Sequence, residues 1–132
     1  MEIIIAGTRF DRHGKPIKPW LAYAMVAEAI QESGFTGITA VHSGGALEGI
    51  DQAGEEWAWA HNIEPQIHRP EYYKVPGDKY APLLRNQKMV DLMKARGGAL
   101  LAVWNGTSRG TQDIIDRAKT AGIPCYVKRC RL

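Results

Sequence analysis

Short apolar or β-branched segments alternate along the chain with longer segments in which apolar residues recur every three or four positions. The short segments predict β-strands, because strands are short and end at glycine or proline. The run at 99–104 is apolar throughout, which is typical of a strand buried on both faces. The predicted strands are 2–6, 38–42, 64–68, 99–104 and 125–129.

The longer segments have the spacing of amphipathic helices. The first is predicted from Trp20 to Ser33 and ends at Gly34, and the second covers about 47–61. A third begins at Pro82, a residue favoured in the first turn of a helix. A fourth follows the loop that ends at Thr111 and stops before Gly122 and Pro124. The apolar stripe of the second helix puts Trp57 in the core and leaves Trp59 exposed, as a candidate subunit contact.

Five strands alternating with four helices predict a three-layer α/β, Rossmann-like domain. Its sheet is parallel, its crossovers are right-handed and its helices cover both faces. With 132 residues, the chain is expected to form one domain, 1–132, large enough to bury a core without disulfides or metals.

Composition excludes several classes of protein. No segment approaches the roughly 20 apolar residues of a membrane span, and no basic segment followed by an apolar one resembles a secretion signal. A cytoplasmic location is therefore expected. The cysteines Cys125 and Cys130 have no spacing typical of a zinc site or a disulfide framework. The net charge is only +3, with much of the excess at Lys128, Arg129 and Arg131.

Three loops that follow strands are rich in glycine, hydroxyl groups or arginine. Glycines let the backbone approach a ligand, and the N–H groups of a first helical turn attract anions. In a parallel sheet, loops after strands meet at the carboxyl edge, where ligands bind in folds of this type. The three loops are Gly7-Thr8-Arg9, Ser43-Gly44-Gly45 through Gly49, and Asn105-Gly106-Thr107-Ser108-Arg109-Gly110-Thr111.

These loops suit an anionic ligand that carries hydroxyl groups, so a nucleotide or a nucleotide-derived molecule is predicted. Arg85, followed by Asn86, lies in the early turns of the third helix and either reaches the anion or forms a surface salt bridge. Glu48 and Asp51 lie in the predicted first turns of the second helix. They either stabilise the helix dipole or contact a ligand group such as a ribose hydroxyl.

The same residues resemble the SLOG superfamily, which contains the LOG cytokinin-activating phosphoribohydrolases and the Smf-type DNA-processing proteins. The chain is most similar to small stand-alone members related to YspA and YpsA. The resemblance implies strand order 3-2-1-4-5, a nucleotide-type ligand and a homodimer or higher homo-oligomer. The matching segments are Gly7-Thr8-Arg9, Ser43-Gly44-Gly45-Ala46 with Gly49 and Asp51, Arg85-Asn86, and Trp104-Asn105-Gly106 through Ser108-Arg109-Gly110-Thr111.

The chain departs from the superfamily pattern at two places. Its glycine motif is one residue longer, with Leu47-Glu48 where the superfamily has a basic residue. Ile114 stands where the phosphoribohydrolases carry a catalytic glutamate, and Asp113 is one position early. Isoleucine neither stabilises an oxocarbenium-like centre nor exchanges a proton, so LOG chemistry is not carried over.

Three functional hypotheses follow. The first is a binding module that senses, carries or sequesters a nucleotide-derived molecule. The second is a nucleotide N-glycosidase or phosphoribohydrolase, with Arg85 or Arg109 on the phosphate and Asp113 or Asp51 as the carboxylate, Glu48 being a further candidate. The third, binding of single-stranded nucleic acid, rests on the Smf relatives and the basic tail, and the modest net charge makes it the weakest.

No cofactor, metal or ATP hydrolysis is predicted. No lysine follows the glycines as it does in a Walker motif, and the four histidines lack the spacing of a metal site. His42 alone adjoins the glycine loop. The long segment 69–81, with Tyr72 and Tyr73, is predicted to be a functional loop that covers either the site or a subunit partner. The four histidines are His13, His42, His61 and His68.

Overall fold

The computed structural model describes residues 1–71 and 79–132. The central part of the predicted loop 69–81, including Tyr72 and Tyr73, therefore lies outside the described residues. The elements in chain order are β1 (Glu2–Gly7), α1 (Pro19–Ser33), β2 (Ala40–Ser43), α2 (Ile50–Ala60), β3 (Gln66–Ile67), α3 (Ala81–Arg96), β4 (Ala99–Trp104), α4 (Arg109–Ala121) and β5 (Cys125–Arg129).

The five strands form one parallel sheet in the order β3-β2-β1-β4-β5. Strand β1 is central and pairs with β2 on one side and β4 on the other, with Ile4 opposite both His42 and Leu100. The predicted α/β class, the parallel sheet and the strand order are confirmed. Because every strand runs in the same direction, the loops that follow β1, β2 and β4 lie along the same edge of the sheet.

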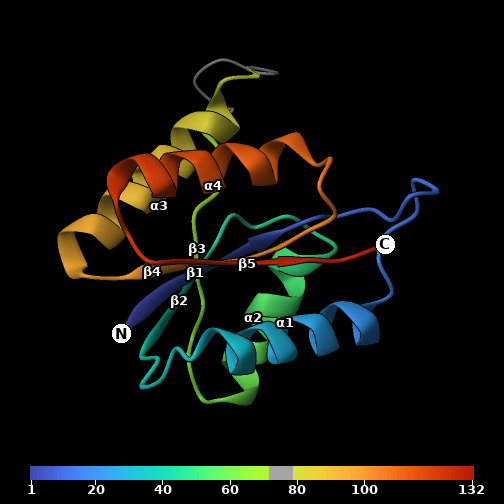
Figure 1. Ribbon diagram of the computed structural model, residues 1–132, viewed down its shortest axis with the longest axis horizontal. Coiled ribbons are helices and arrows are strands. Elements are labelled where there is room, and N and C mark those ends of the chain that lie inside the picture. The colour runs from blue at the N-terminus through green and yellow to red at the C-terminus, as the bar shows by residue number, and fades with distance from the viewer. Residues whose placement is uncertain (72–78) are drawn as a thin grey trace.

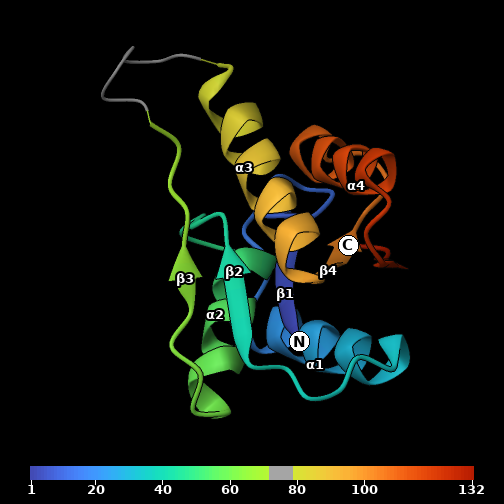
Figure 2. The same cartoon turned by 90° about the vertical axis from the view of Figure 1, so that its left-hand side faces the viewer.

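Helices cover both faces of the sheet, as Figures 1 and 2 show: α1 and α2 lie on one side and α3 and α4 on the other. The alternation of side chains along β1 divides the core accordingly. Ile3 and Ile5 pack in the cluster with α1 and α2, whereas Ile4 packs with α3 and α4. Strand β4 is buried along nearly its whole length, as its continuous apolar sequence predicts.

Proline and glycine set most of the helix ends. Pro19 and Pro82 lie in the first turns of α1 and α3, and left-handed glycines follow α1, α3 and α4. The predicted start of the second helix near Leu47 is wrong, because α2 begins at Ile50. Gly49 has φ 78° and ψ −146°, a conformation incompatible with a helix.

The second and third strands depart furthest from their predicted bounds. The third strand, predicted at 64–68, pairs only over Gln66–Ile67, and the second covers Ala40–Ser43 rather than 38–42. β3 is an edge strand with exposed side chains, so little burial stabilises a longer pairing. Among the described residues, no helix has the length and apolarity needed to cross a membrane.

Candidate functional site

A cavity of about 530 Å³ opens at the carboxyl edge of the sheet. The loops after β1, β2, β3 and β4 contribute to its wall, together with the first turns of α3 and α4. Its volume falls within the range of pockets that hold small molecules and cofactors. The polar or glycine residues that line it are Gly7, Arg9, Gly44, Gly45, Asp51, Arg69, Arg85, Asn86, Ser108, Gly110 and Thr111.

Most of the residues selected from the sequence are thus brought together around one cavity. The remaining candidates do not line it, because they bond to neighbouring loops and helices or are exposed to solvent. These candidates are Thr8, Ser43, Glu48, Asn105, Gly106, Arg109 and Asp113.

Gly44 allows two charged side chains to approach the loop after β2. A Cβ atom at this position would lie 2.7 Å from Arg85 Nη1 and 3.0 Å from Asp51 Oδ2. Neither contact leaves room for a larger residue without movement of its neighbour. The glycine therefore accommodates the protein's own charged groups beside the cavity, besides any approach it allows to a ligand.

Arg85 is held by its surroundings on three sides. Its Nη1 donates to the carbonyl of Gly44 at 2.5 Å and to that of His68 at 3.3 Å, and its Nε donates to Asn86 Oδ1 at 2.9 Å. These bonds tie α3 to the loops after β2 and β3 and place a positive charge in the cavity wall. The guanidinium is thus oriented by neutral carbonyl and amide oxygens.

Asp51 is the buried acid of the site. It lies in the first turn of α2 with 8% of its surface exposed, and its Oδ2 accepts a hydrogen bond of 3.3 Å from the backbone N–H of Ala46. Burial raises the pKa of Asp51 to about 6, although the Ala46 hydrogen bond and the positive charge of Arg85 act in the opposite direction. A carboxyl group with this pKa exchanges protons readily near neutral pH.

Arg9 and Glu48 form an ion pair at the rim of the cavity. Arg9 Nε donates to Glu48 Oε1 at 2.9 Å, and its Nη2 contacts the same oxygen. Because Gly49 interrupts the chain before α2, Glu48 lies ahead of the helix, and its predicted place in the first turn is wrong. Glu48 therefore balances the charge of Arg9.

Arg69, which the sequence analysis did not select, also lines the cavity and donates to the carbonyl of Gly45 at 3.1 Å. It lies two residues beyond the end of β3, so the rule that ligands bind beyond the carboxyl ends of strands would have identified it. The apolar part of the wall, including Leu83, Met89 and Ile114, was also not selected. These side chains carry helical periodicity, which signals burial and gives no sign of a cavity.

The first turn of α4 closes one side of the cavity through Ser108, Gly110 and Thr111. The hydroxyl oxygens of Ser108 and Thr111 lie 3.1 Å apart. The N–H groups of a first helical turn lack partners within the helix, so this turn presents donors to an anion. Arg109 begins the helix but is exposed and lines neither this cavity nor the second one described below, so its contact with a ligand stays a prediction.

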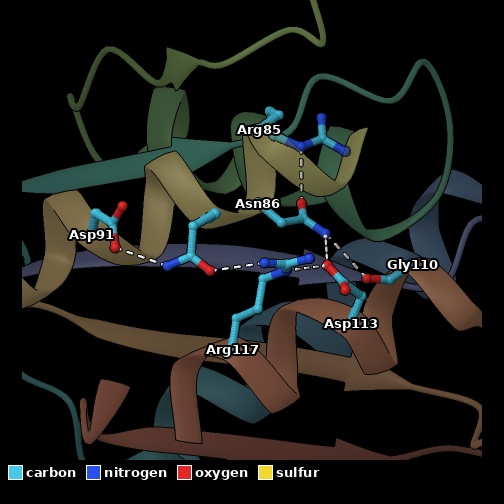
Figure 3. Close-up of polar contacts among 7 residues, drawn as sticks. Arg85, Asn86, Asp91, Gly110, Asp113 and Arg117 are labelled. Carbon is cyan, nitrogen blue, oxygen red and sulfur yellow. Dashed lines mark hydrogen bonds and ion pairs between the residues drawn. The ribbon is translucent and has the colours of Figure 1, made fainter. Parts of the chain in front are cut away.

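Asn86 connects Arg85 to α4, as Figure 3 shows. Its Nδ2 donates to Asp113 Oδ2 at 3.0 Å and to the carbonyl of Gly110 at 3.4 Å. The same Asp113 oxygen accepts from Arg117 Nε at 2.8 Å. Asp113 is therefore engaged between α3 and α4 and does not line the cavity. Of the two carboxylates that the sequence favoured for catalysis, Asp51 alone borders the cavity.

Three further candidates support the loops. Thr8 Oγ1 accepts a hydrogen bond of 3.1 Å from the backbone N–H of Asn105, which joins the loops after β1 and β4. Asn105 Oδ1 accepts from the N–H groups of Thr107 and Ser108, both at 2.9 Å. Ser43 is buried, and its hydroxyl donates to Glu55 Oε2 at 2.6 Å. These contacts fix the loops that carry the site.

His42 belongs to a polar cluster with Glu2, His68 and Arg96. It is fully buried, with Nε2 2.8 Å from Glu2 Oε1 and Nδ1 2.9 Å from His68 Nε2. Arg96 Nη1 donates to the same Glu2 oxygen at 3.0 Å. Among the described residues, no group of three or more metal-ligand side chains is suitably placed for an ion.

The exposure predicted for the aromatic residues of α2 is confirmed. Trp57 is 8% exposed and packs in the core, whereas Trp59 is 60% exposed. A subunit contact at Trp59 stays a prediction.

No protein-family model, curated protein or solved structure matches this chain, so its function is inferred from the geometry of the site.

Proposed function

We propose that the protein binds a nucleotide or a nucleotide-derived small molecule in the cavity at the carboxyl edge of the sheet. The observation that carries this proposal is the convergence of a basic wall, formed by Arg9, Arg69 and Arg85, with the first turn of α4 around one cavity of about 530 Å³. Guanidinium groups and helical N–H groups are the donors that bind phosphate in proteins.

The cavity also offers groups that suit the uncharged parts of a nucleotide. Leu83, Met89 and Ile114 provide apolar surface for a base. The carboxyl group of Asp51 and the hydroxyl groups of Ser108 and Thr111 provide partners for sugar hydroxyls. The resemblance to the SLOG superfamily, which implies a nucleotide-type ligand held by these loops, also stays a proposal.

Mass spectrometry of small molecules that co-purify with the folded protein tests the proposal first. Titration calorimetry with the nucleoside 5′-monophosphates, ADP-ribose and cyclic nucleotides follows. We expect binding by the unmodified chain and about tenfold weaker binding by Arg69→Ala and Arg85→Ala, since each loses a charge-assisted contact.

Lys119→Ala is the matched control, because it removes a positive charge from the exposed last turn of α4, at the other end of that helix. It should bind like the unmodified chain, and thermal melts confirm that each variant is folded. Absence of binding to every compound tested, and of any co-purified nucleotide, would contradict the proposal.

The second candidate is hydrolysis of the N-glycosidic bond of a nucleotide, and Asp51 is the observation that favours it. Its pKa of about 6 suits proton exchange with a leaving base or an attacking water. Against it stands Ile114, which lines the cavity where the LOG enzymes carry their glutamate. Release of free base and ribose 5-phosphate, lost in Asp51→Asn while nucleotide still binds, would establish this activity. Recovery of intact nucleotide after prolonged incubation would exclude hydrolysis and favour binding alone.

A further inference from the structure

A second cavity, of about 440 Å³, adjoins the loop after β4. Asn105 and Thr107 line this cavity, whereas Ser108 lines the first one. Thr107 and Ser108 are consecutive residues, so a single loop separates the two cavities. The loop after β1 also contributes to both, through Arg9 on one side and Arg12 on the other. The loops after β1 and β4 therefore border both cavities.

The second cavity is lined by Arg12, Arg129 and Arg131 and, among the described residues, by no aspartate or glutamate side chain. Arg129 is held in place, because its guanidinium carbon lies 5.0 Å from the centre of the Trp104 ring. It also packs directly against Gly106, whose φ of 89° and missing side chain leave room for it. The candidate Gly106 is thus explained by a contact with arginine.

The neighbouring basic residue is used differently. Lys128 points toward α1, where it pairs with Glu32 at 2.8 Å and Glu28 at 3.4 Å. The end of β5 thus neutralises one positive charge and presents the next one to the cavity. The backbone N–H of Arg12 donates to a main-chain oxygen of Leu132 at 3.0 Å, and its guanidinium Nε donates to His13 Nε2 at 3.4 Å.

Building on the proposed nucleotide site, we infer that the second cavity is a phosphate subsite. The ligand class that fits both cavities is a nucleotide with a second phosphate beyond its sugar, such as a 5′-phosphorylated dinucleotide. Its first nucleotide occupies the larger cavity, and its second phosphate meets Arg129 and Arg12 across the Asn105–Ser108 loop. A guanidinium group can donate two parallel hydrogen bonds to one phosphate, which suits a phosphate placed beside these two arginines.

Titration calorimetry with the four nucleoside 5′-monophosphates and the four matching 5′-phosphorylated homodinucleotides tests the inference. We expect at least one dinucleotide to bind about tenfold more tightly than its mononucleotide, as for one added charge-assisted hydrogen bond. Arg129→Gln and, separately, Arg12→Gln should remove most of this gain and leave mononucleotide affinity unchanged. Lys119→Gln, at the far end of α4, should change neither affinity.

The outcomes separate this inference from the proposed function. Equal affinity for mononucleotides and dinucleotides, insensitive to both arginine changes, overturns the subsite and leaves the nucleotide site standing. Dinucleotide binding that depends on Arg129, without mononucleotide binding, supports the subsite and contradicts a self-sufficient first cavity. Failure of all eight compounds to bind overturns the subsite, and the proposed function is then decided by ADP-ribose, the cyclic nucleotides and any co-purified nucleotide.

Discussion

Arg85 and Asp51 both reach Gly44, where a Cβ atom would lie 2.7 Å from Arg85 Nη1 and 3.0 Å from Asp51 Oδ2. The opposite charges of the two side chains act on each other, since Arg85 partly offsets the effect of burial on the pKa of Asp51. The missing side chain at Gly44 thus brings a cation and a titratable acid together in one cavity wall.

Gly44→Ala is therefore expected to displace Arg85 or Asp51. Overpacking of this kind costs about 1–3 kcal/mol of folding free energy, and nucleotide affinity should fall with it. Chemical denaturation and calorimetry measure the two effects.

Gly110→Ala is the matched control, because a Cβ atom there meets nothing within 4 Å. Its stability should stay within about 1 kcal/mol of the unmodified chain, on the stabilising side. Equal stabilities for the two variants would show that the loop adapts and that Gly44 is not required.

Asp51→Asn should make the protein more stable at pH 7.5. The ordinary aspartate pKa of 3.8 is raised to about 6 by folding, so between these values the folded chain binds more protons than the unfolded chain. Stability therefore falls as pH rises from about 4 to 6, by roughly 3 kcal/mol for this group alone. Asparagine carries no charge to desolvate and still accepts from Ala46. Urea denaturation at pH 4 and 7.5 measures the change, and a gain of the same size at both pH values would exclude the mechanism.

The predictable part of this fold depends on features that lie close together in the sequence. The continuous apolar run of β4 and the alternation of strands with helices fix a parallel, three-layer arrangement. The start of α2 was missed because Gly49 ends the preceding loop in a positive-φ conformation. Glycine occurs both within helical patterns and in turns, so the sequence alone does not distinguish the two. The length of β3 was overestimated because the extent of an exposed edge strand depends on its pairing with the neighbouring strand, which the sequence pattern does not show.

The sequence predicted that the candidate loops lie together at one edge of the sheet, but not the contacts that their residues make. Topology brings the loops after parallel strands together, so the candidate loops could be selected without knowing their contacts. The hydrogen bond between Thr8 and the backbone of Asn105 joins residues 97 positions apart, and no local pattern reveals it. For the same reason Asp113 appeared to be a catalytic candidate, although Asn86 and Arg117 hold it between two helices.

Asn86→Asp should destabilise the protein by about 2–4 kcal/mol at pH 7. It replaces a donor to Asp113 Oδ2, 3.0 Å away, by a second carboxylate. The destabilisation should shrink at acidic pH, where the two adjacent carboxyl groups can share a proton. Thermal and urea denaturation across this range measure it.

The double variant Asn86→Asp with Asp113→Asn exchanges donor and acceptor across the same contact. It should recover at least half of the lost stability, because an amide again faces a carboxylate. Asp113→Asn is also measured alone, with Asn86 unchanged. If it raises the free energy of unfolding by the same amount in both backgrounds, the two positions are not in direct contact.

His68 should remain neutral below the ordinary histidine pKa. Its partial burial lowers the pKa of His68, and the nearby His42 adds to this effect. Between the folded pKa and 6.5 the unfolded chain binds more protons, so this group makes stability rise with pH and costs stability as pH falls below 6.5. The slope is opposite to that of Asp51, so it is best measured in Asp51→Asn. NMR titration of the imidazole protons locates the folded pKa directly. A His68 pKa at or above 6.5 would show that the pair with His42 favours the charged form.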